Sequence, residues 1–203
     1  MRESLYPRAH ELGIPVIADA TPASRPLRLH KKTELDRCFR DALQTSAGVL
    51  GAHCVHELWM RGEMANRIEG MLESLWATCA TSIPEWLPMR HIDWLPQVYE
   101  IAARSKAGAR GRSNIYLVLL DYNDRRSGPY GVYVGMTSYS PAQRFDQHKA
   151  GIRAAGCVLK RGIEVLAGPT LHLQRIRRAE AARIEQELAA RFADAGLVVE
   201  GGH

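Results

Sequence analysis

The sequence predicts an α+β fold, in which a small mixed sheet of order β-β-α-β-α is flanked by helices and preceded by an all-α N-terminal domain. Three observations favour this fold. Apolar residues recur at helical spacing over residues 33–105, two short β-branched segments follow from residue 114, and a long amphipathic helix lies near the end. We expect residues 1–32 to form a proline-rich arm and residues 106–112 a basic linker, which leaves residues 113–203 for the mixed module.

Charge distinguishes the two parts of the chain. The 203 residues include 27 Lys plus Arg against 22 Asp plus Glu. Residues 1–108 hold 13 of each sign, whereas residues 109–203 hold 14 basic and 9 acidic residues, so the net charge of +5 belongs to the C-terminal part. An arginine-dominated module favours an anionic partner, and nucleic acid is the commonest one, although basic residues also serve solubility.

Composition excludes several classes of protein. A hydrophobic fraction of 46% is enough for a packed core and excludes a chain that is disordered throughout. No apolar stretch approaches the roughly 20 residues that cross a bilayer, so we expect no membrane partner. The four cysteines are far apart and form no C-x-x-C pair, which favours free thiols. Without a basic and apolar leader, the chain is expected to be cytoplasmic.

Helical spacing marks the N-terminal domain. Thr33 is the expected N-cap of a first helix, whose apolar pattern is interrupted by two glycines. A short last helix is expected after a proline-rich segment. His53, His56 and Glu57 lack the spacing of a zinc-protease motif, so we expect structural histidines, one packed and one exposed. A second helix has a continuous apolar stripe, formed by Met64, Ile68, Met71, Leu72, Leu75, Trp76 and Cys79.

The C-terminal module opens with a predicted β-hairpin. Residues 115–120 are apolar and β-branched enough for a buried strand, and residues 132–134 supply its partner. Residues 123–128 between them have the composition of a turn. Each predicted strand presents one tyrosine, Tyr116 and Tyr133.

A helix should follow the hairpin. Ser140 and Pro141 are its expected N-cap and first residue, and it should end at about the residue before Gly151. Arg144 and His148 then lie one turn apart on the same face, so both side chains can point at the hairpin.

Three further elements complete the predicted module. A third strand is expected near residues 163–166, and a long helix with an apolar stripe over about residues 177–193. Residues 197–199 are expected to form a short edge strand.

The order of these elements and residues resembles the GIY-YIG nuclease family. The first motif of that family appears as Asn114-Ile115-Tyr116 and the second as Tyr133-Val134-Gly135. The helix arginine of the family corresponds to Arg144, which is followed by His148, and the glutamate of its last long helix to Glu185. The resemblance covers a little under half of the chain and implies a GIY-YIG-like fold and a metal-dependent endonuclease.

The resemblance also implies a role for each residue. Tyr116 would activate or position the attacking water, with Tyr133 hydrogen bonded nearby. Because a tyrosine ordinarily has a pKa of about 10, a neighbour must favour its deprotonated form or relay its proton, and His148 is the expected neighbour. Arg144 is expected at the scissile phosphate. One Mg²⁺ or Mn²⁺ ion per site is expected on Glu185, because a lone carboxylate suits a hard and mostly hydrated cation.

Several positions are left open by the sequence. Glu180 and Glu187 are rivals of Glu185 because all three lie in one predicted helix, where the register of the family favours Glu185. Asn114 stands where the family usually has glycine. The family often ends its core with an asparagine near the active site, and no asparagine follows the predicted turn. His203 either takes this place or belongs to a frayed terminus.

The resemblance therefore implies a nuclease, for which DNA is favoured over RNA as the substrate, although the sequence does not decide between them. The helical N-terminal domain would serve target choice or homo-oligomerisation. Two alternatives are an inactive GIY-YIG-like module that binds nucleic acid or protein, and an RNase or interbacterial toxin. The basic residues expected to contact the phosphate backbone are Lys149, Lys160, Arg161, Arg175, Arg177 and Arg178.

Overall fold

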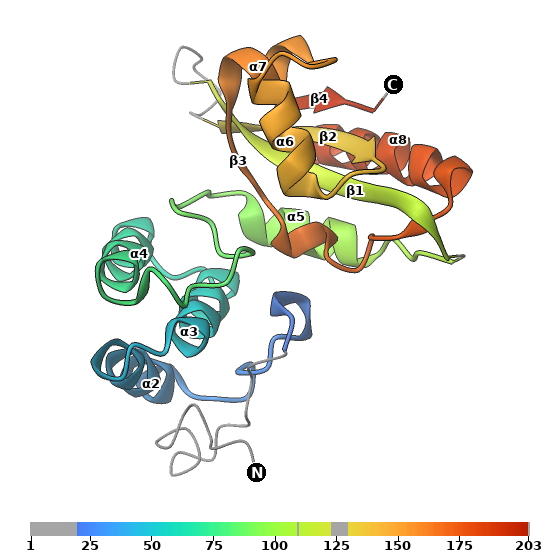
Figure 1. Ribbon diagram of the computed structural model, residues 1–203. Helices are drawn as coiled ribbons and strands as arrows, with labels where there is room; N and C mark the ends of the chain where they lie inside the picture. The colour runs from blue at the N-terminus through green and yellow to red at the C-terminus, as the bar shows by residue number, and fades with distance from the viewer. Residues whose placement is uncertain (1–19, 109, 123–129, 203) are drawn as a thin grey trace, which may run out of the picture. The chain divides into compact units, whose positions relative to one another are not determined.

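The computed structural model of the protein describes residues 20–108, 110–122 and 130–202 (Figure 1). These residues contain seven α-helices and a four-stranded mixed sheet, which confirms the predicted α+β class. The chain divides into two compact units, Met1–Pro96 and Gln97–His203. Residues 1–19 of the predicted arm, the predicted turn at 123–128 and His203 lie outside the described residues. Among the described helices, none has the length and hydropathy that crossing a bilayer requires.

The described part of the first unit is helical. Most of the apolar stripe predicted for residues 64–79 is buried in a helix of this unit, including Ile68 and Leu75. Met64 is an exception, because it precedes the helix and is 65% exposed, and Trp76 is only partly buried. The prediction of Thr33 as an N-cap is wrong. The first α-helix begins at Lys32, so Thr33 lies inside it and Lys31 is the N-cap. The backbone N–H of Lys31 donates to the carboxylate of Glu34 at 2.7 Å. The helices of this unit are η1 (Pro22–Ser24), α2 (Lys32–Gln44), α3 (Gly48–Met60) and α4 (Ala65–Cys79).

Two histidines of α3 lie in the core of the first unit. His53 and His56 are both buried, so the expectation that one of them is exposed is wrong. Their rings contact the indole of Trp86, with ring centroids 4.8 and 5.8 Å apart. Burial removes the hydration that a charged imidazole needs, and it lowers the pKa of His53 to about 4 and that of His56 to about 3. Both rings are therefore neutral at pH 7.

Glu57, the next residue of α3, is buried as a charged group. Its carboxylate accepts hydrogen bonds from Arg25 at 2.8 Å and from Arg61 at 2.7 Å. Burial raises the pKa of Glu57, but hydrogen bonds from the two guanidinium groups outweigh burial and hold the pKa below its usual value. The ion pairs fix the segment after η1 against α3.

The second unit contains the sheet, with strand order β3-β1-β2-β4. β1 pairs antiparallel with β2 and with β3, whereas β2 pairs in parallel with β4. The predicted pair of strands, the third strand and the terminal edge strand are all present. β1 begins at Arg110, within the stretch expected to be a linker. The strands are β1 (Arg110–Asp121), β2 (Tyr130–Thr137), β3 (Gly162–Val165) and β4 (Val199–Gly201).

Helices cover both faces of this sheet (Figure 1). In Figure 1, α6 and α7 lie in front of the sheet and pack against β1 and β3, while α8 lies behind it and packs against β1, β2 and β4. The predicted start of α6 is confirmed, because Ser140 Oγ accepts the backbone N–H of Gln143 at 3.2 Å and Pro141 is the first residue. The helices are α5 (Leu95–Ala103), α6 (Pro141–Lys149), α7 (Gly156–Arg161), η2 (Gly168–Thr170) and α8 (Arg178–Asp194).

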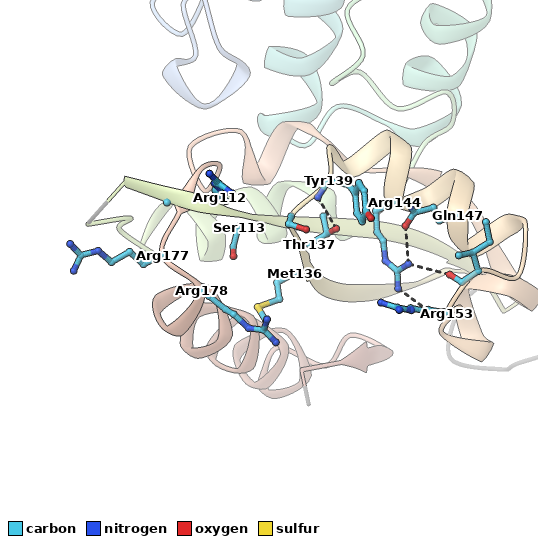
Figure 2. Close-up of a pocket in the computed structure, with 13 residues that line it drawn as sticks. Arg112, Ser113, Met136, Thr137, Tyr139, Arg144, Gln147, Arg153, Arg177 and Arg178 are labelled. Carbon is cyan, nitrogen blue, oxygen red and sulfur yellow. Dashed lines mark hydrogen bonds between the residues drawn. The ribbon is translucent and has the colours of Figure 1, made fainter.

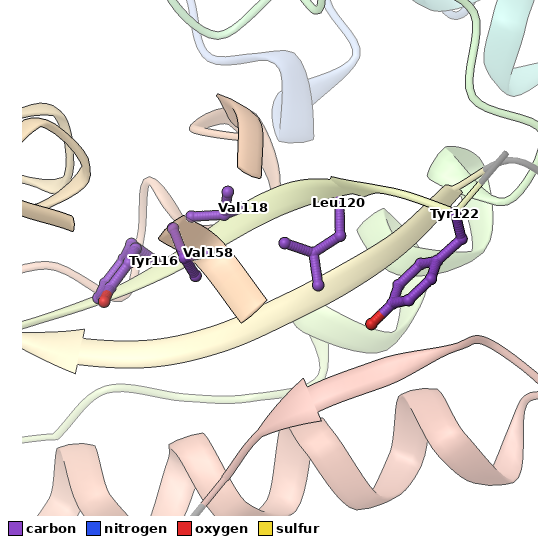
Figure 3. Packing of buried hydrophobic residues seen from close by; sticks show 5 residues of the cluster. All are labelled: Tyr116, Val118, Leu120, Tyr122 and Val158. Carbon is purple, nitrogen blue, oxygen red and sulfur yellow. The ribbon is translucent and has the colours of Figure 1, made fainter. Parts of the chain in front are cut away.

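The core of the second unit is built on β1. Alternate residues of β1 point toward α7, where Val158 packs on them, and the residues between them are equally buried on the other face. Burial on both faces explains why this strand is a continuous apolar run. The side chains that Figure 3 draws in this cluster are Tyr116, Val118, Leu120, Tyr122 and Val158.

The lowered pKa values of His53 and His56 predict that the first unit loses stability in mild acid. An unfolded histidine has a pKa of about 6.5, so below that pH the unfolded chain binds protons that the folded unit rejects. Stability is therefore complete above about pH 6.5 and falls toward about pH 4, by about 1.4 kcal/mol per pH unit for each histidine. Urea unfolding followed by tryptophan fluorescence measures the loss, since all four tryptophans lie in this unit.

The matched control is the double variant His53→Phe, His56→Phe, which keeps an aromatic ring at both positions. We expect its unfolding free energy to vary less with pH than that of the wild type. Equal losses in the two proteins would show that other groups cause the acid sensitivity.

Candidate active site

The two tyrosines of the predicted hairpin lie on the same face of the sheet. In the β1–β2 register Tyr116 is opposite Gly135, and Tyr133 is opposite Val118, so the tyrosines are diagonal neighbours with ring centroids 5.9 Å apart. A Cβ atom on Gly135 would lie 2.8 Å from the Tyr116 hydroxyl and 2.6 Å from the Tyr133 ring. The glycine that follows Tyr133-Val134 is therefore required because the two phenol rings fill its space.

His148, in the last turn of α6, is buried and holds the hydroxyl of Tyr116. Its Nε2 atom is 2.8 Å from the Tyr116 hydroxyl oxygen, and its Nδ1 atom accepts the backbone N–H of Ala155 at 2.9 Å. Because Nδ1 is an acceptor, the proton of the neutral ring is on Nε2. His148 therefore donates a hydrogen bond to Tyr116. Of the two roles expected for it, this geometry suits stabilisation of the Tyr116 phenolate and opposes a proton relay.

The charge states of these three groups follow from burial and from Arg144. Burial, followed by the charge of Arg144, lowers the pKa of His148 to about 4, so the ring is neutral at pH 7. Burial, and then the neighbouring Tyr133, raise the pKa of Tyr116, while Arg144 lowers it. Burial also raises the pKa of Tyr133, which a hydrogen bond with Tyr116 partly offsets. Both phenols are thus protonated at pH 7.

Arg144 forms hydrogen bonds with the segment that precedes Ala155, the residue whose N–H orients His148. Its Nη1 donates to Gln147 Oε1 at 3.1 Å and to the carbonyl of Ile152 at 3.2 Å, and its Nη2 donates to the carbonyl of Arg153 at 2.8 Å. This segment leads directly to Ala155, whose N–H sets the tautomer of His148. Arg144 therefore supports the orientation of His148 as well as its electrostatic environment.

Arg144 also lines a cleft of about 910 Å³, here called the arginine cleft. Five of its lining residues are arginines, and among the described residues that line it none is Asp or Glu. In Figure 2, Arg112 and Arg177 lie to the left of the cleft, Arg144 and Arg153 to the right, and Arg178 below. The lining residues are Gly111, Arg112, Ser113, Met136, Thr137, Ser138, Tyr139, Arg144, Gln147, Ile152, Arg153, Arg177 and Arg178.

Three of the six basic residues proposed from the sequence gather here. Arg177 and Arg178 line the arginine cleft, and Arg175 lines an adjoining pocket of about 480 Å³ together with Arg110 and Arg112. The latter two arginines were missed because their segment was interpreted as a linker rather than as the start of β1. Strand geometry brings them beside residues that are more than 60 positions away in the sequence.

The other three basic residues lie elsewhere. Lys149 donates to the carbonyls of Leu159 at 3.3 Å and Gly162 at 3.1 Å. Arg161 donates to the carbonyl of Asp121 at 3.0 Å, and its guanidinium lies over the Tyr122 ring. Lys160 is exposed. The first two are thus engaged in packing α6 and α7 onto the sheet.

Tyr133 also lines a second pocket, of about 420 Å³, here called the acidic pocket. Glu185 of α8 is buried and close enough to Tyr133 to raise its pKa. Glu200 of β4 is the register partner of Tyr133, and its carboxylate accepts the Tyr122 hydroxyl at 2.7 Å. The lining residues are Tyr133, Ala155, Gly156, Cys157, Glu185, Glu200, Gly201 and Gly202.

The two rivals of Glu185 have other contacts. Glu180 accepts the backbone N–H of Gly108 at 2.7 Å, and Glu187 is paired with Arg183 one turn away on α8. Of the three glutamates, Glu185 is the one that lines the acidic pocket. This arrangement agrees with the register of the resemblance.

The donor set of the acidic pocket fits a hard divalent cation. Among the described residues, no group of three or more His, Cys, Asp and Glu side chains is placed to hold a metal ion. Mg²⁺, however, commonly binds proteins through one or two carboxylates and keeps several waters. Glu185, Glu200 and the Tyr133 hydroxyl supply oxygen donors of that kind in a pocket with room for water.

The C-terminal residues form part of this site. Gly201 and Gly202 have φ angles of 92° and 78°, and a Cβ on Gly201 would lie 2.0 Å from the carbonyl oxygen of Val134. These two positions require glycine, so they are not a frayed end. Glu200 was missed from the sequence, because only the parallel pairing of β4 with β2 brings it beside Tyr133. His203 lies outside the described residues.

The side chain of Asn114 joins β1 to the segment before α6 and to the segment before α8. Its Nδ2 donates to the carbonyl of Tyr139 at 2.7 Å, and its Oδ1 accepts the backbone N–H of Arg175 at 2.8 Å. A glycine at this position offers neither bond. The departure from the motif therefore has a structural role that motif matching did not predict.

The candidate site thus has three adjoining parts: the arginine cleft, the Tyr116–His148 pair with Tyr133, and the acidic pocket. Comparisons of the chain with family models, with curated proteins and with solved structures gave no match. The site brings five arginines, a buried phenol and two carboxylates into one part of the second unit.

The tautomer of His148 is directly measurable. At pH 7 we expect the proton on Nε2, which long-range ¹H–¹⁵N NMR correlations of the imidazole identify. The variant Ala155→Pro removes the N–H that bonds to Nδ1, and the φ angle of −70° at this residue suits proline. In this variant we expect a population with the proton on Nδ1. Ala154→Ser serves as the matched control and should retain the Nε2–H form. A wild-type ring protonated on Nδ1 would contradict the assignment.

Proposed function

We propose that the protein is a GIY-YIG-type endonuclease that hydrolyses phosphodiester bonds in nucleic acid, with DNA as the favoured substrate. The observation that carries this proposal is the buried Tyr116–His148 hydrogen bond, beside which Arg144 of the same helix lines an arginine-rich cleft and Tyr133 lines a carboxylate-lined pocket. The arginines provide the cations for a phosphate backbone, and the phenol provides a group that can accept a proton.

The chemistry assigned to the chain is the activation of water. Solvent hydroxide first takes the hydroxyl proton of Tyr116, which leaves a phenolate. A water oxygen then attacks phosphorus and passes one proton to the Tyr116 oxygen, while the bond from phosphorus to one ester oxygen breaks and the departing oxygen takes a proton from solvent water. The N–H of His148 and the guanidinium of Arg144 stabilise the negative charge on Tyr116 that this step requires. Arg144 also lines the arginine cleft, which is assigned to the phosphate backbone.

The carboxylates of Glu185 and Glu200 are the residues assigned to a Mg²⁺ or Mn²⁺ ion. When bound, such an ion neutralises charge on the phosphate and on the departing oxygen. Glu200 replaces His203 in our assignment of the position where the family has asparagine, because it lines the same pocket as Glu185. Tyr133 lines this pocket and is hydrogen bonded to Tyr116, so it helps to orient the hydroxyl group of Tyr116.

One observation favours a second function, which is the binding of nucleic acid without cleavage. Burial raises the pKa of Tyr116, so its phenol is protonated at pH 7, and His148 cannot take this proton because its Nδ1 already accepts the N–H of Ala155 and its Nε2 carries a proton. A site with this property retains the arginine cleft but has a weaker base. The two functions differ in one readout, which is strand cleavage.

Cleavage assays test the nuclease proposal. Plasmid, single-stranded DNA, branched DNA and RNA are incubated with Mg²⁺ or Mn²⁺. We expect the wild type to cut, and the variants Tyr116→Phe and Glu185→Gln to lose about 100-fold or more in rate, the usual cost of removing a catalytic acid or base. Glu187→Gln is the matched control, since Glu187 lies on the same helix and is paired with Arg183 outside the pocket. It should cut at the wild-type rate.

Binding of the same substrates in EDTA distinguishes the two functions. All variants should bind like the wild type, because the substitutions leave the arginine cleft intact. Binding without cleavage by the wild type in either metal would sink the nuclease proposal and favour the second function.

A further inference from the structure

Tyr139 is an exposed aromatic residue in the wall of the arginine cleft. Its side chain is 51% exposed, although large aromatic side chains usually bury most of their surface. Ile152, in the same lining, is 56% exposed, and Met136 in that lining is partly exposed. The cleft thus combines exposed apolar side chains with five arginines. Charge alone would be enough to bind a polyanion, so the apolar side chains indicate a ligand that also has an apolar part.

The backbone of Tyr139 is held rigidly. Its N–H donates to Thr137 Oγ1 at 3.1 Å, and its carbonyl accepts the amide of Asn114 at 2.7 Å. The next residue, Ser140, is the N-cap of α6 and forms a capping box with Gln143. The turn is therefore fixed on both sides, so a ligand that packs on the ring pays little entropy for ordering it.

Figure 2 shows the ring of Tyr139 beside Arg144 in the wall of the arginine cleft. A base held on this ring would leave its phosphates among Arg144, Arg153 and the arginines across the cleft. Bases inside a duplex are stacked on each other and offer no face to such a ring, whereas unpaired bases do.

We infer that the cleft binds single-stranded or locally unpaired nucleic acid, with one base stacked on Tyr139 next to the phosphate that is cut. This inference rests on the proposed function, because it takes the polyanion to be nucleic acid. It adds a preference for unpaired strands and a positioning residue that acts on a base.

A double comparison of protein and ligand tests this role. The full chain is titrated in EDTA with a labelled single strand of about 10 nucleotides and with an abasic strand of the same length, and fluorescence anisotropy gives both affinities. Tyr139→Ala should weaken binding of the strand that has bases by about 5-fold to 100-fold and leave the abasic strand unchanged. Tyr139→Phe keeps the ring and should bind like the wild type. Leu159→Ala, an exposed apolar residue outside the cleft, should also bind like the wild type.

Three results would overturn the inference: no effect of Tyr139→Ala, an equal effect on both strands, or an equal effect on duplex DNA. Failure of the proposed function gives a different result. A protein that never cuts but shows the base-dependent loss would reject the nuclease and keep the stacking role. A protein that cuts but shows no base-dependent loss would keep the nuclease and reject the stacking role.

Discussion

The hydrogen bond between the Tyr116 hydroxyl and His148 is the constraint on which the second unit depends. It joins the central strand to α6 inside the core, where neither polar group can turn to water. Gly135 must lack a side chain to leave room for the phenol, and Ala155 must present its N–H so that the imidazole proton faces Tyr116. Arg144 in turn holds the segment that contains that N–H. The sheet, α6 and the loop that contains Ala155 thus each contribute a residue that the Tyr116–His148 hydrogen bond requires.

Charge is divided across this pair. Arginines gather on the side of the cleft, and the carboxylates of Glu185 and Glu200 lie in the pocket that Tyr133 shares. Under the proposed function, the arginines would bind the phosphate backbone and the two carboxylates would hold the cation. His148 adds no charge of its own at pH 7, because burial and the charge of Arg144 lower its pKa to about 4.

The sequence predicted what local patterns encode. The strand pair, the start of α6 at Ser140 and the long helix α8 all follow from periodicity, turn residues or capping. α7 was missed because six residues show no period. Glu200 was missed because it reaches the acidic pocket through parallel pairing between distant segments, which no local pattern records. The role of His148 as donor was also out of reach, since it depends on one backbone N–H of a loop. Motif order identified the candidate residues, but only their placement separated Glu185 from its neighbours on α8.

The central claim is that the Tyr116 oxygen accepts the proton of the attacking water. The most direct test is the pH dependence of cleavage in protein with a fluorinated tyrosine at position 116, because such a phenol ionises at lower pH. Burial raises the pKa of Tyr116, so the wild-type rate should rise with pH, without a plateau up to about pH 9. With the fluorinated residue the curve should shift to lower pH and level off. An identical pH profile in the two proteins would contradict the account.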